Sequence, residues 1–418
     1  QTLNNSGLNY YGGVLTTDPF QFNLAQSNNN EIRSMSSSNV LEIATSALNY
    51  TASGGDSFLS NANVKISRQT EGGSRAIPPL AAGNGTVYVS PNGKLLNYFR
   101  FSEANGSHIM VNLSRLGDEV IQRGSTSYYN NVTINAITYD RTRKCIWGLS
   151  APDSTLGLLG NELFSLAFDP ESKLVGWAKH DLGGIANPGT AESIVGLSVL
   201  PQESGAFDSL FLLVKRVVNS ATVYYIEKMA KESGLSDMAA IIESEGCIYL
   251  DSSYFANNSG VPKTAWTVAH LANETVRVLG DGIDQGEYTA DGSGNITLTT
   301  AANQVTIGLP YTARIKSLSA ETGAPFGDSF GLIQRIGQTL VSFWNSRGGT
   351  MGGAGENLDD IEYVQEDGTA DTAGVAQTKI VDHRLDMTPN RDAKWEIAHS
   401  EPYPFNLRAV QQKGVTND

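Results

Sequence analysis

Turn-forming residues recur along this chain at intervals that leave room only for short extended segments. In "VYVSPNGKLLNYF", residues 87–99, apolar residues alternate with others before Pro91-Asn92-Gly93, and a second strand-like run follows directly. Asn and Gly tolerate positive φ, so such a turn connects two antiparallel strands. The chain is therefore expected to fold as β-hairpins and meanders.

The same strand–turn–strand unit returns through the middle of the chain. Asp140-Arg141-Thr142, Asp169-Pro170 and Asn219-Ser220 each separate two strand-like runs. The units recur about every 30–35 residues, which favours a β-propeller, with a stacked sandwich as the alternative. Trp147 and Trp177 close two of the units, and we expect them to be buried in neighbouring sheets of one body.

Helical signals are few. Leu113–Ile121 carries apolar residues on one helical face. Ser236–Gly246 begins with a good N-cap residue and ends with a good C-cap residue. We expect two short helices.

The chain divides into four predicted regions within a mainly β fold. Between 266 and 318 the sequence predicts five short strands about ten residues apart, the last over Thr312–Leu318, which is typical of a small barrel or sandwich. The predicted regions are an N-terminal arm with loops (1–38), a β-propeller-like body of antiparallel meanders (39–265), an inserted small β-barrel or sandwich domain (266–320) and C-terminal strands completing the body (321–418).

Composition limits the possible partners. The 418 residues are 40% hydrophobic and 17% charged, with a net charge of -14. A protein that grips DNA phosphates needs a basic face, so tight DNA binding is not expected. No apolar stretch approaches the roughly 18 residues of a membrane span. Two cysteines, Cys145 and Cys247, make no disulfide framework. The chain begins at Gln1, and we expect a processed product or a fragment.

Four carboxylates, those of Asp281, Asp284, Glu287 and Asp291, cluster in the small predicted domain. Two of the aspartates directly precede glycine, where aspartate commonly bonds nearby backbone amides in turns. The spacing differs from that of a calcium loop with its terminal bidentate Glu. We interpret the cluster as turn chemistry, with a weak cation site near Asp281 as the alternative.

No other residue pattern defines a reaction centre. The glycine-rich Gly348–Gly355 lacks the lysine of a phosphate-binding loop and is interpreted as a flexible surface loop. Asp359-Asp360 is interpreted as a solvated turn rather than a glycosidase pair. The histidines lack metal-ligand spacing; they are His108, His180, His270, His383 and His399. We predict no catalytic, cofactor-binding or metal-binding residues, no cofactor, and a chain that is not an enzyme.

Charged residues on one predicted hairpin point to assembly. Lys215, Arg216, Glu227 and Lys228 alternate with apolar residues on both sides of Asn219-Ser220. Such residues form cross-strand charge pairs, and exposed strand edges are usually covered by a partner. We expect them on a solvated or subunit-facing edge.

Several stretches together resemble the tail nozzle family of short-tailed bacteriophages, also known as tail tubular protein B or tail hub. They are "SNVLEIATSALNYTASG", "VKISRQTEGGSRAIPPLAAGNGTVYVSPNGKLLNYFRF", "AITYDRTRKCIWGL", "LVGWAKHDLGG", "LFLLVKRVVNSATVYYIEKM" and "HLANETVRVLGDG" with "VTIGLPYTARIKSL". They follow the family's order and span residues 35–320. "QTLVSFWNSRGGTMG" and "SEPYPFNLRAV" resemble the family's C-terminal strands, whereas its usual N-terminal region is missing or reduced.

The resemblance implies a structural virion protein. It implies a homo-hexameric ring below the portal and adaptor proteins, in contact with tail fibre or needle proteins, assembled in the host bacterial cytoplasm. It also implies a channel that retains genomic DNA and then lets it pass, without specific binding and without catalytic residues. An acidic channel wall would repel phosphate and let DNA slide.

Two other functions remain open. One is a host-receptor or glycan-binding β-propeller of a phage tail, and the other is a secreted β-rich enzyme. A glycan-binding protein needs exposed aromatic side chains near paired carboxylates. The tryptophans lie inside strand-like runs, which favours core packing; they are Trp147, Trp177, Trp266, Trp344 and Trp395.

Overall fold

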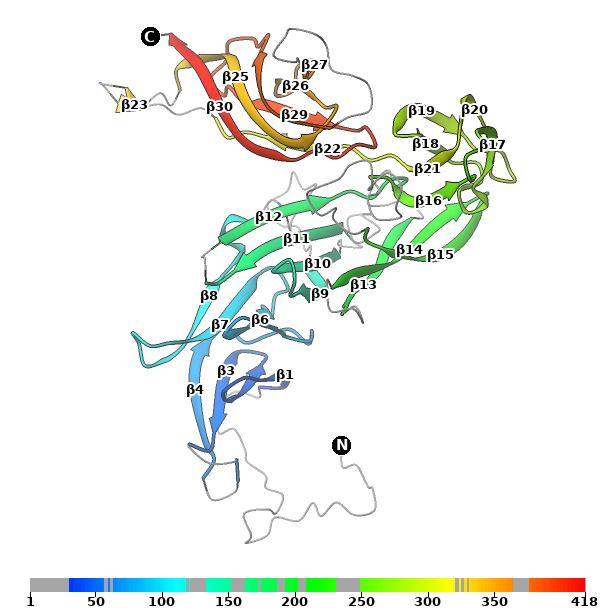
Figure 1. Ribbon diagram of the computed structural model, residues 1–418. Helices are drawn as coiled ribbons and strands as arrows, with labels where there is room; N and C mark the ends of the chain where they lie inside the picture. Colours follow the sequence, from blue (N-terminus) through cyan, green and yellow to red (C-terminus); the bar gives the residue numbers. More distant parts are fainter. Residues whose placement is uncertain are drawn as a thin grey trace. The chain divides into compact units, whose positions relative to one another are not determined.

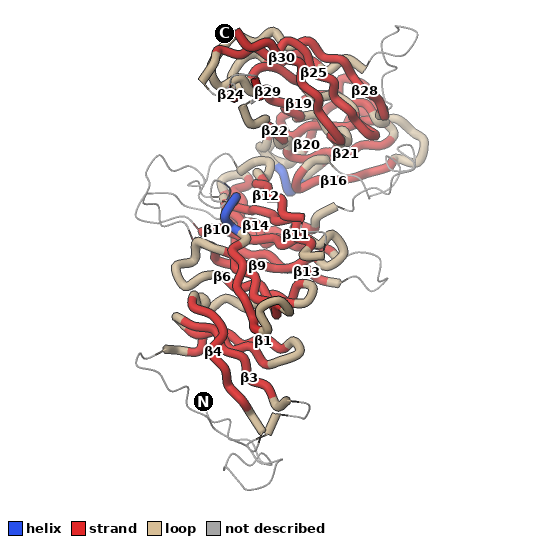
Figure 2. The backbone as a smooth tube through the Cα atoms, turned by 90° about the vertical axis from the view of Figure 1, so that its left-hand side faces the viewer, coloured by secondary structure: helices blue, strands red, loops and turns tan. Residues whose placement is uncertain are grey.

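A computed structural model shows a chain built almost entirely from antiparallel strands (Figures 1 and 2). It describes residues 30–55, 59–60, 63–117, 120, 133–151, 162–171, 174–185, 192–201, 208–230, 249–319, 323–324, 327–328, 331–363 and 376–417. The contacts divide the chain into two compact units. The first unit comprises 1–180, 187–216 and 224–229, and the second comprises 181–186, 217–223 and 230–418.

Sheets in the first unit follow the order of the sequence. Three consecutive four-stranded meanders and one three-stranded meander account for the strands described there. The strands are β1 (Ile32–Ser37), β2 (Leu41–Thr45), β3 (Leu48–Ser53) and β4 (Lys65–Glu71); β5 (Leu80–Ala82), β6 (Gly85–Val89), β7 (Leu96–Ser102) and β8 (Ser107–Asn112); β9 (Thr133–Asp140), β10 (Cys145–Ala151), β11 (Glu162–Asp169) and β12 (Leu174–His180); and β13 (Ser193–Leu200), β14 (Ser209–Val218) and β15 (Ala221–Lys228). The prediction of a mainly β fold of antiparallel meanders is confirmed.

The turn residues read from the sequence lie between these strands. Gly93 has φ +76° at the end of the β6–β7 turn, and Asn219 and Ser220 have φ +49° and +63° between β14 and β15. Two successive residues with positive φ form the hairpin turn that matches the twist of the flanking strands. The amide of Lys94 donates to Asn92 Oδ1 at 3.0 Å and closes the first of these turns.

The largest core of the first unit joins sheets that are separate in sequence. Its buried residues include Val87 and Leu96 of the second sheet and Ile146, Phe164 and Leu166 of the third. Alternation along each strand directs these side chains to one face. Burying an aliphatic or aromatic side chain of this size contributes about 1.5–3 kcal/mol, so the core holds the two meanders together.

The two tryptophans of the repeated meanders lie in one sheet, not in neighbouring sheets as predicted. Trp147 on β10 is buried, whereas Trp177 on β12 is half-buried and donates from Nε1 to the carbonyl of Leu113 at 3.2 Å. The prediction was wrong because both repeats of the strand–turn–strand pattern belong to the same four-stranded meander.

The second unit contains a small β-module, β16–β21, with its own core. Its strands are β16 (Asp251–Asn257), β17 (Lys263–Thr267), β18 (Thr275–Gly280), β19 (Ile283–Thr289), β20 (Asn295–Ala302) and β21 (Gln304–Leu309). Four of them form the sheet β16-β21-β18-β19, and β17 pairs with β20. Val276, Val278, Val305 and Ile307 are fully buried. These strands therefore have a hydrophobic core of their own.

Both ends of this module differ from the prediction. The sheet includes β16, so the module begins at Asp251, ahead of the predicted boundary at 266. The last predicted strand, Thr312–Leu318, contributes β22 (Ala313–Lys316), which pairs with β29 (Trp395–His399) instead of with the module. Local alternation identifies a strand but not its partner, and this partner lies about eighty residues further along the chain.

The C-terminal module, β22–β30, forms its own sheets. Its other strands are β23 (Gly323–Ala324), β24 (Gly327–Asp328), β25 (Ile333–Ser346), β26 (Thr350–Gly353), β27 (Leu358–Asp360), β28 (Gln377–Arg384) and β30 (Leu407–Asn417). Val341, Phe343, Met351 and Ile397 are buried in one core. These strands were expected to complete the body of residues 39–265. They pair with one another instead, because their apolar faces have partners within the module.

The remaining predictions are described only in part. Ser114–Leu116 is a 3₁₀ helix closed by Gly117, and Val120 packs on the main core of the first unit. The rest of the predicted helix at Leu113–Ile121 lies outside the described residues, as do the predicted helix at Ser236–Gly246, Cys247 and residues 1–29 of the predicted arm. Residues 30–38 of that arm contain β1. Among the described residues, no helix is long and apolar enough to cross a membrane.

Candidate functional site

The two aspartates that precede glycine in the small β-module organise turns. Asp281, at φ +47°, accepts hydrogen bonds from the amides of Asn303 and Gln304 at 3.0 and 2.9 Å. Asp291 accepts from the amides of Ser293 and Asn295, both at 2.8 Å. These bonds, the one from Asn295 foremost, hold the pKa of Asp291 below its usual value. Both carboxylates thus perform the turn role inferred from the sequence.

Asp284 has a different partner. Arg277 on β18 donates from Nε to both carboxylate oxygens of Asp284 on β19, at 3.1 Å each, and its Nη2 also contacts Oδ2. Both side chains are about 15% exposed. The hydrogen bonds to Asp284 raise the pKa of Arg277. A forked pair of this kind fixes the orientation of both planar groups.

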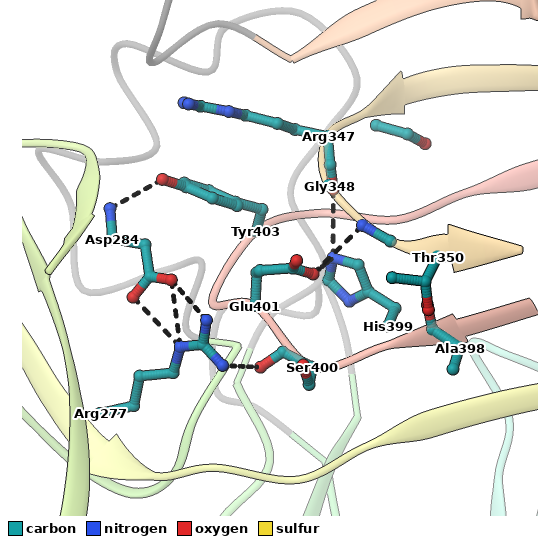
Figure 3. Close-up of polar contacts among 12 residues, drawn as sticks. Arg277, Asp284, Arg347, Gly348, Thr350, Ala398, His399, Ser400, Glu401 and Tyr403 are labelled. Carbon is teal, nitrogen blue, oxygen red and sulfur yellow. Dashed lines mark hydrogen bonds and ion pairs between the residues drawn. The ribbon is translucent and has the colours of Figure 1, made fainter. Parts of the chain in front are cut away.

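The Arg277–Asp284 pair is also bonded to the loop that follows β29. Arg277 Nη1 donates to the carbonyl of Ser400 at 3.0 Å, and the amide of Asp284 donates to the Tyr403 hydroxyl at 2.7 Å (Figure 3). Burial raises the pKa of Tyr403, so its hydroxyl stays neutral. The small β-module and the C-terminal module thus share a polar contact.

A second set of contacts lies on the other side of the same loop. His399 Nε2 is 3.1 Å from the carbonyl of Arg347 and 3.5 Å from Glu401 Oε2, and that oxygen also accepts from the amide of Gly349 at 3.1 Å. The His399 ring stacks on Phe405 with centroids 4.6 Å apart. Burial lowers the pKa of His399, although the nearby Glu401 carboxylate acts in the opposite direction. His399 is neutral near pH 7 and donates to the Arg347 carbonyl.

Arg347 completes the group. Its guanidinium lies over the Tyr403 ring, 4.3 Å from the centroid, and its buried Nη1 has no hydrogen-bond partner among the residues that the structure describes. A cation over an aromatic face is attracted by the ring quadrupole, so the aromatic ring provides part of the stabilisation that a carboxylate would otherwise give. We call Arg277, Asp284, Arg347, His399, Glu401 and Tyr403 the polar junction (Figure 3).

The predicted flexible loop at Gly348–Gly355 is part of this structure, and that interpretation was wrong. Gly348 and Gly349 have φ +68° and +89°. A Cβ on Gly349 would lie 2.6 Å from Phe405 Cε2, and one on Gly348 would lie 2.9 Å from Glu401 Oε2. Thr350–Gly353 is strand β26, paired with β27 and β29. The glycines are needed for close packing and left-handed backbone, not for flexibility.

Asp359 and Asp360, interpreted as a solvated turn, belong instead to strand β27. Both side chains are exposed. The buried carboxylate of this module is that of Glu396, which accepts from Arg314 at 2.8 Å and lies 3.2 Å from Lys316. Burial raises the pKa of Glu396, but these cations outweigh it and leave the pKa below its usual value.

The histidines make separate polar contacts. His270 and His383 lie 2.8 and 3.2 Å from backbone carbonyls, and His180 lies 2.7 Å from the Ser165 hydroxyl. His108 stacks on Phe99. No group of three or more His, Cys, Asp or Glu side chains in the described residues could hold a metal ion. Burial raises the pKa of Cys145 to about 11, so this thiol stays protonated.

The contacts of the polar junction are those of a structural link between the two modules, because its carboxylates are occupied by partners. Asp284 is neutralised by Arg277, and Glu401 accepts from an amide beside His399. Sequence reasoning included Asp284 and His399 but missed Arg277, Arg347, Glu401 and Tyr403. The sequence contains one indication of Arg277, which is a single cationic residue between two apolar residues, Val276 and Val278. Glu401 and Tyr403 lie in an irregular loop, where no periodicity marks them.

No family model matches the chain, and no curated protein matches it. Among solved structures, it is similar to two of the exo-β-1,3-galactanase from Phanerochaete chrysosporium, variants of the enzyme with β-1,3-galactotriose. The identities are 12% and 13%, and each match covers 90% of this chain and 78% of the galactanase chain with a TM-score of 0.23.

These matches correct one prediction. The chain was expected not to be an enzyme, yet the solved structures that it matches are those of a glycan-cleaving enzyme, so that expectation is withdrawn. A TM-score of 0.23 transfers neither the galactanase's activity nor its residues to this chain.

Proposed function

We propose that this chain is a structural subunit of a phage tail, the nozzle of a short-tailed bacteriophage. The observation that carries the proposal is the ordered set of stretches that resemble the nozzle family. They fall on β2–β7, β9, β10, β12, β14, β15, β18, β21 and β22. The resemblance therefore involves the strands and turns that build the sheets.

The charge of the chain fits a conduit for DNA. The net charge is -14, from 43 Asp and Glu against 29 Lys and Arg. Tight DNA binding depends on Lys and Arg that neutralise phosphates and release counterions. In a ring of six copies, acidic side chains facing the channel would repel phosphate and let DNA slide.

The polar junction joins the two modules of the second unit. Two hydrogen bonds join the small β-module to the loop after β29, and a forked ion pair within the small β-module orients the two residues that make them. Breaking a buried ion pair leaves an uncompensated charge, at a cost of about 3–5 kcal/mol. The two modules of the second unit are thus held together without a large shared core.

Electron microscopy of the full chain, alone and with the portal, adaptor and fibre proteins of its tail, tests the proposal. A sixfold ring with a central channel is expected. A chain that stays monomeric with those partners and instead binds polysaccharide would refute the nozzle and favour the alternative, a host-receptor or glycan-binding β-propeller.

A further inference from the structure

The sheet β13-β14-β15 exposes an apolar face. Along β14 the even-numbered residues from Leu210 to Val218 are buried, and the odd-numbered residues between them are more exposed. Along β15 the even-numbered residues from Thr222 to Lys228 are the exposed ones. Since side chains alternate between the faces of a strand, one face of this sheet packs inward and the other faces solvent.

Strand register brings the outward side chains together. Leu213 pairs with Gly196 of β13, where an added Cβ would meet nothing within 4 Å. The two-residue turn and the hydrogen bond from the Met229 amide to the Leu210 carbonyl set Leu213 opposite Ile226 and Lys215 opposite Tyr224. Gly196 therefore leaves open space beside Leu213, whereas side chains project into solvent from the neighbouring positions of β14 and β15.

Its apolar members are among the most exposed in the described part of the chain. Ile226 is 77% exposed, Tyr224 60% and Leu200 51%, and Leu213 lies beside Ile226. Single exposed apolar residues are ordinary, but a contiguous set on one sheet face marks an interaction surface. We call Leu200, Phe211, Leu213, Lys215, Tyr224, Ile226 and Lys228 the β13–β15 face.

The charges on this face have one sign. Lys215 and Lys228 are its charged residues, and Lys228 Nζ lies 5.8 Å from the centre of the Phe211 ring. Glu227 points to the other side, where it pairs with the buried Arg216 at 2.7 Å. In the described residues neither lysine forms an ion pair with a carboxylate. The partner should therefore offer an apolar surface with carboxylates at its rim.

A second copy of this chain meets that requirement, because acidic residues exceed basic ones by 14. The second copy cannot provide these carboxylates from its own β13–β15 face. A twofold contact would bring four ammonium groups together without a carboxylate, which is repulsive. The contact must therefore join two different surfaces, and such head-to-tail contacts form closed rings or filaments.

We propose that the β13–β15 face binds a different, acid-rimmed surface of a second copy of the chain, head to tail. The inference rests on the proposed function, and it assigns one side of the contact between subunits. It also gives a role to the predicted subunit-facing hairpin. All four charged residues of this hairpin were expected on a solvated or subunit-facing edge. Instead, Arg216 and Glu227 form a pair on the inward face, and only Lys215 and Lys228 lie on the outward face.

Photo-crosslinking tests the contact. The full chain carrying p-benzoylphenylalanine in place of Tyr224 is illuminated at concentrations where copies associate, and the products are mapped by mass spectrometry. Crosslinks between copies that join position 224 to residues outside the β13–β15 face are expected. Crosslinks only within one chain, or between two copies of the face, would overturn the proposal.

Matched variants give a second measurement. Leu200→Asp with Ile226→Asp should raise the concentration needed for association by at least about tenfold, as loss of a central apolar contact does. The melting temperature should change little because both residues are exposed. Ile380→Asp, at a 71% exposed strand position of the second unit, is the control. An equal effect of the control, or no effect of the pair, would contradict the inference.

The inference and the proposed function can fail separately. A sixfold ring whose copies crosslink through other surfaces would leave the nozzle proposal standing and reject this contact. Head-to-tail crosslinks through Tyr224 in an assembly without a channel would support the contact and reject the nozzle.

Discussion

At the scale of single residues, the two aspartates that precede glycine in the small β-module stabilise turns. Asp281 and Asp291 each accept two backbone amide hydrogen bonds. At Asp291 one oxygen accepts from both amides, and an Asn side chain keeps such an oxygen, so Asp291→Asn should change the free energy of unfolding by less than about 1 kcal/mol. Asp281 uses a separate oxygen for each amide, so Asp281→Asn sets an NH2 group against one of them and should cost more than Asp291→Asn. Thermal denaturation with and without calcium checks this. A calcium-dependent rise in melting temperature that either variant abolishes would instead support the cation site.

The glycines before β26 lead to a second prediction. Gly349→Ala combines a left-handed backbone with a Cβ only 2.6 Å from Phe405, whereas Gly355→Ala at φ +83° meets nothing within 4 Å. Backbone strain alone costs about 1–2 kcal/mol. Gly349→Ala should lose at least about 1 kcal/mol more than Gly355→Ala because the overlap adds to the strain. Urea denaturation of both variants measures the difference, and equal losses would contradict the packing role.

His399 should make stability depend on pH. Burial lowers its pKa in the folded state, while the unfolded chain keeps a value of about 6.5. Below that pH the unfolded state binds more protons, so stability falls as the pH falls from about 6.5 towards the folded pKa. Denaturation between about pH 5 and 7.5 should show a shallower slope for His399→Gln than for the wild type. His108, whose pKa burial also lowers, leaves part of the slope in both proteins. An unchanged slope would contradict a neutral, buried His399.

At the scale of elements, the polar junction should couple the two modules of the second unit. Tyr403→Phe removes the acceptor of the Asp284 amide, and Arg277→Ala removes the bond to Ser400 and strands the Asp284 carboxylate. An unsatisfied buried amide costs about 1–3 kcal/mol. The two losses should not add, since both groups meet at Asp284. A double-mutant cycle by denaturation checks this, and strict additivity would show that the contacts act independently.

The elements also show how far the sequence alone could predict this fold. Alternation and turn residues predicted the hairpins at Asn92-Gly93 and Asn219-Ser220, because these signals are local. The pairing of β22 with β29 could not be predicted, since both partners are ordinary strands far apart in sequence. Glycines 348 and 349 suggested a loop, because nothing local distinguishes glycine needed for close packing from glycine in a mobile segment.

The candidate site was predictable to a smaller extent. Asp281 and Asp291 were assigned turn roles from the residue after each. Arg277 and Tyr403 were missed in part because the hydrogen bonds from Arg277 to Ser400 and from Asp284 to Tyr403 join different modules. A forked ion pair between neighbouring strands becomes visible only when the register places Arg277 near Asp284.

At the scale of the whole molecule, the central claim is that six copies form a conduit. Native mass spectrometry of the full chain with its tail proteins measures the number of copies most directly. One copy has a mass of 44.7 kDa, so a ring of six predicts a species of about 270 kDa, alone or as a stable part of a larger tail complex. A chain that remains at the mass of one copy under these conditions would contradict the account.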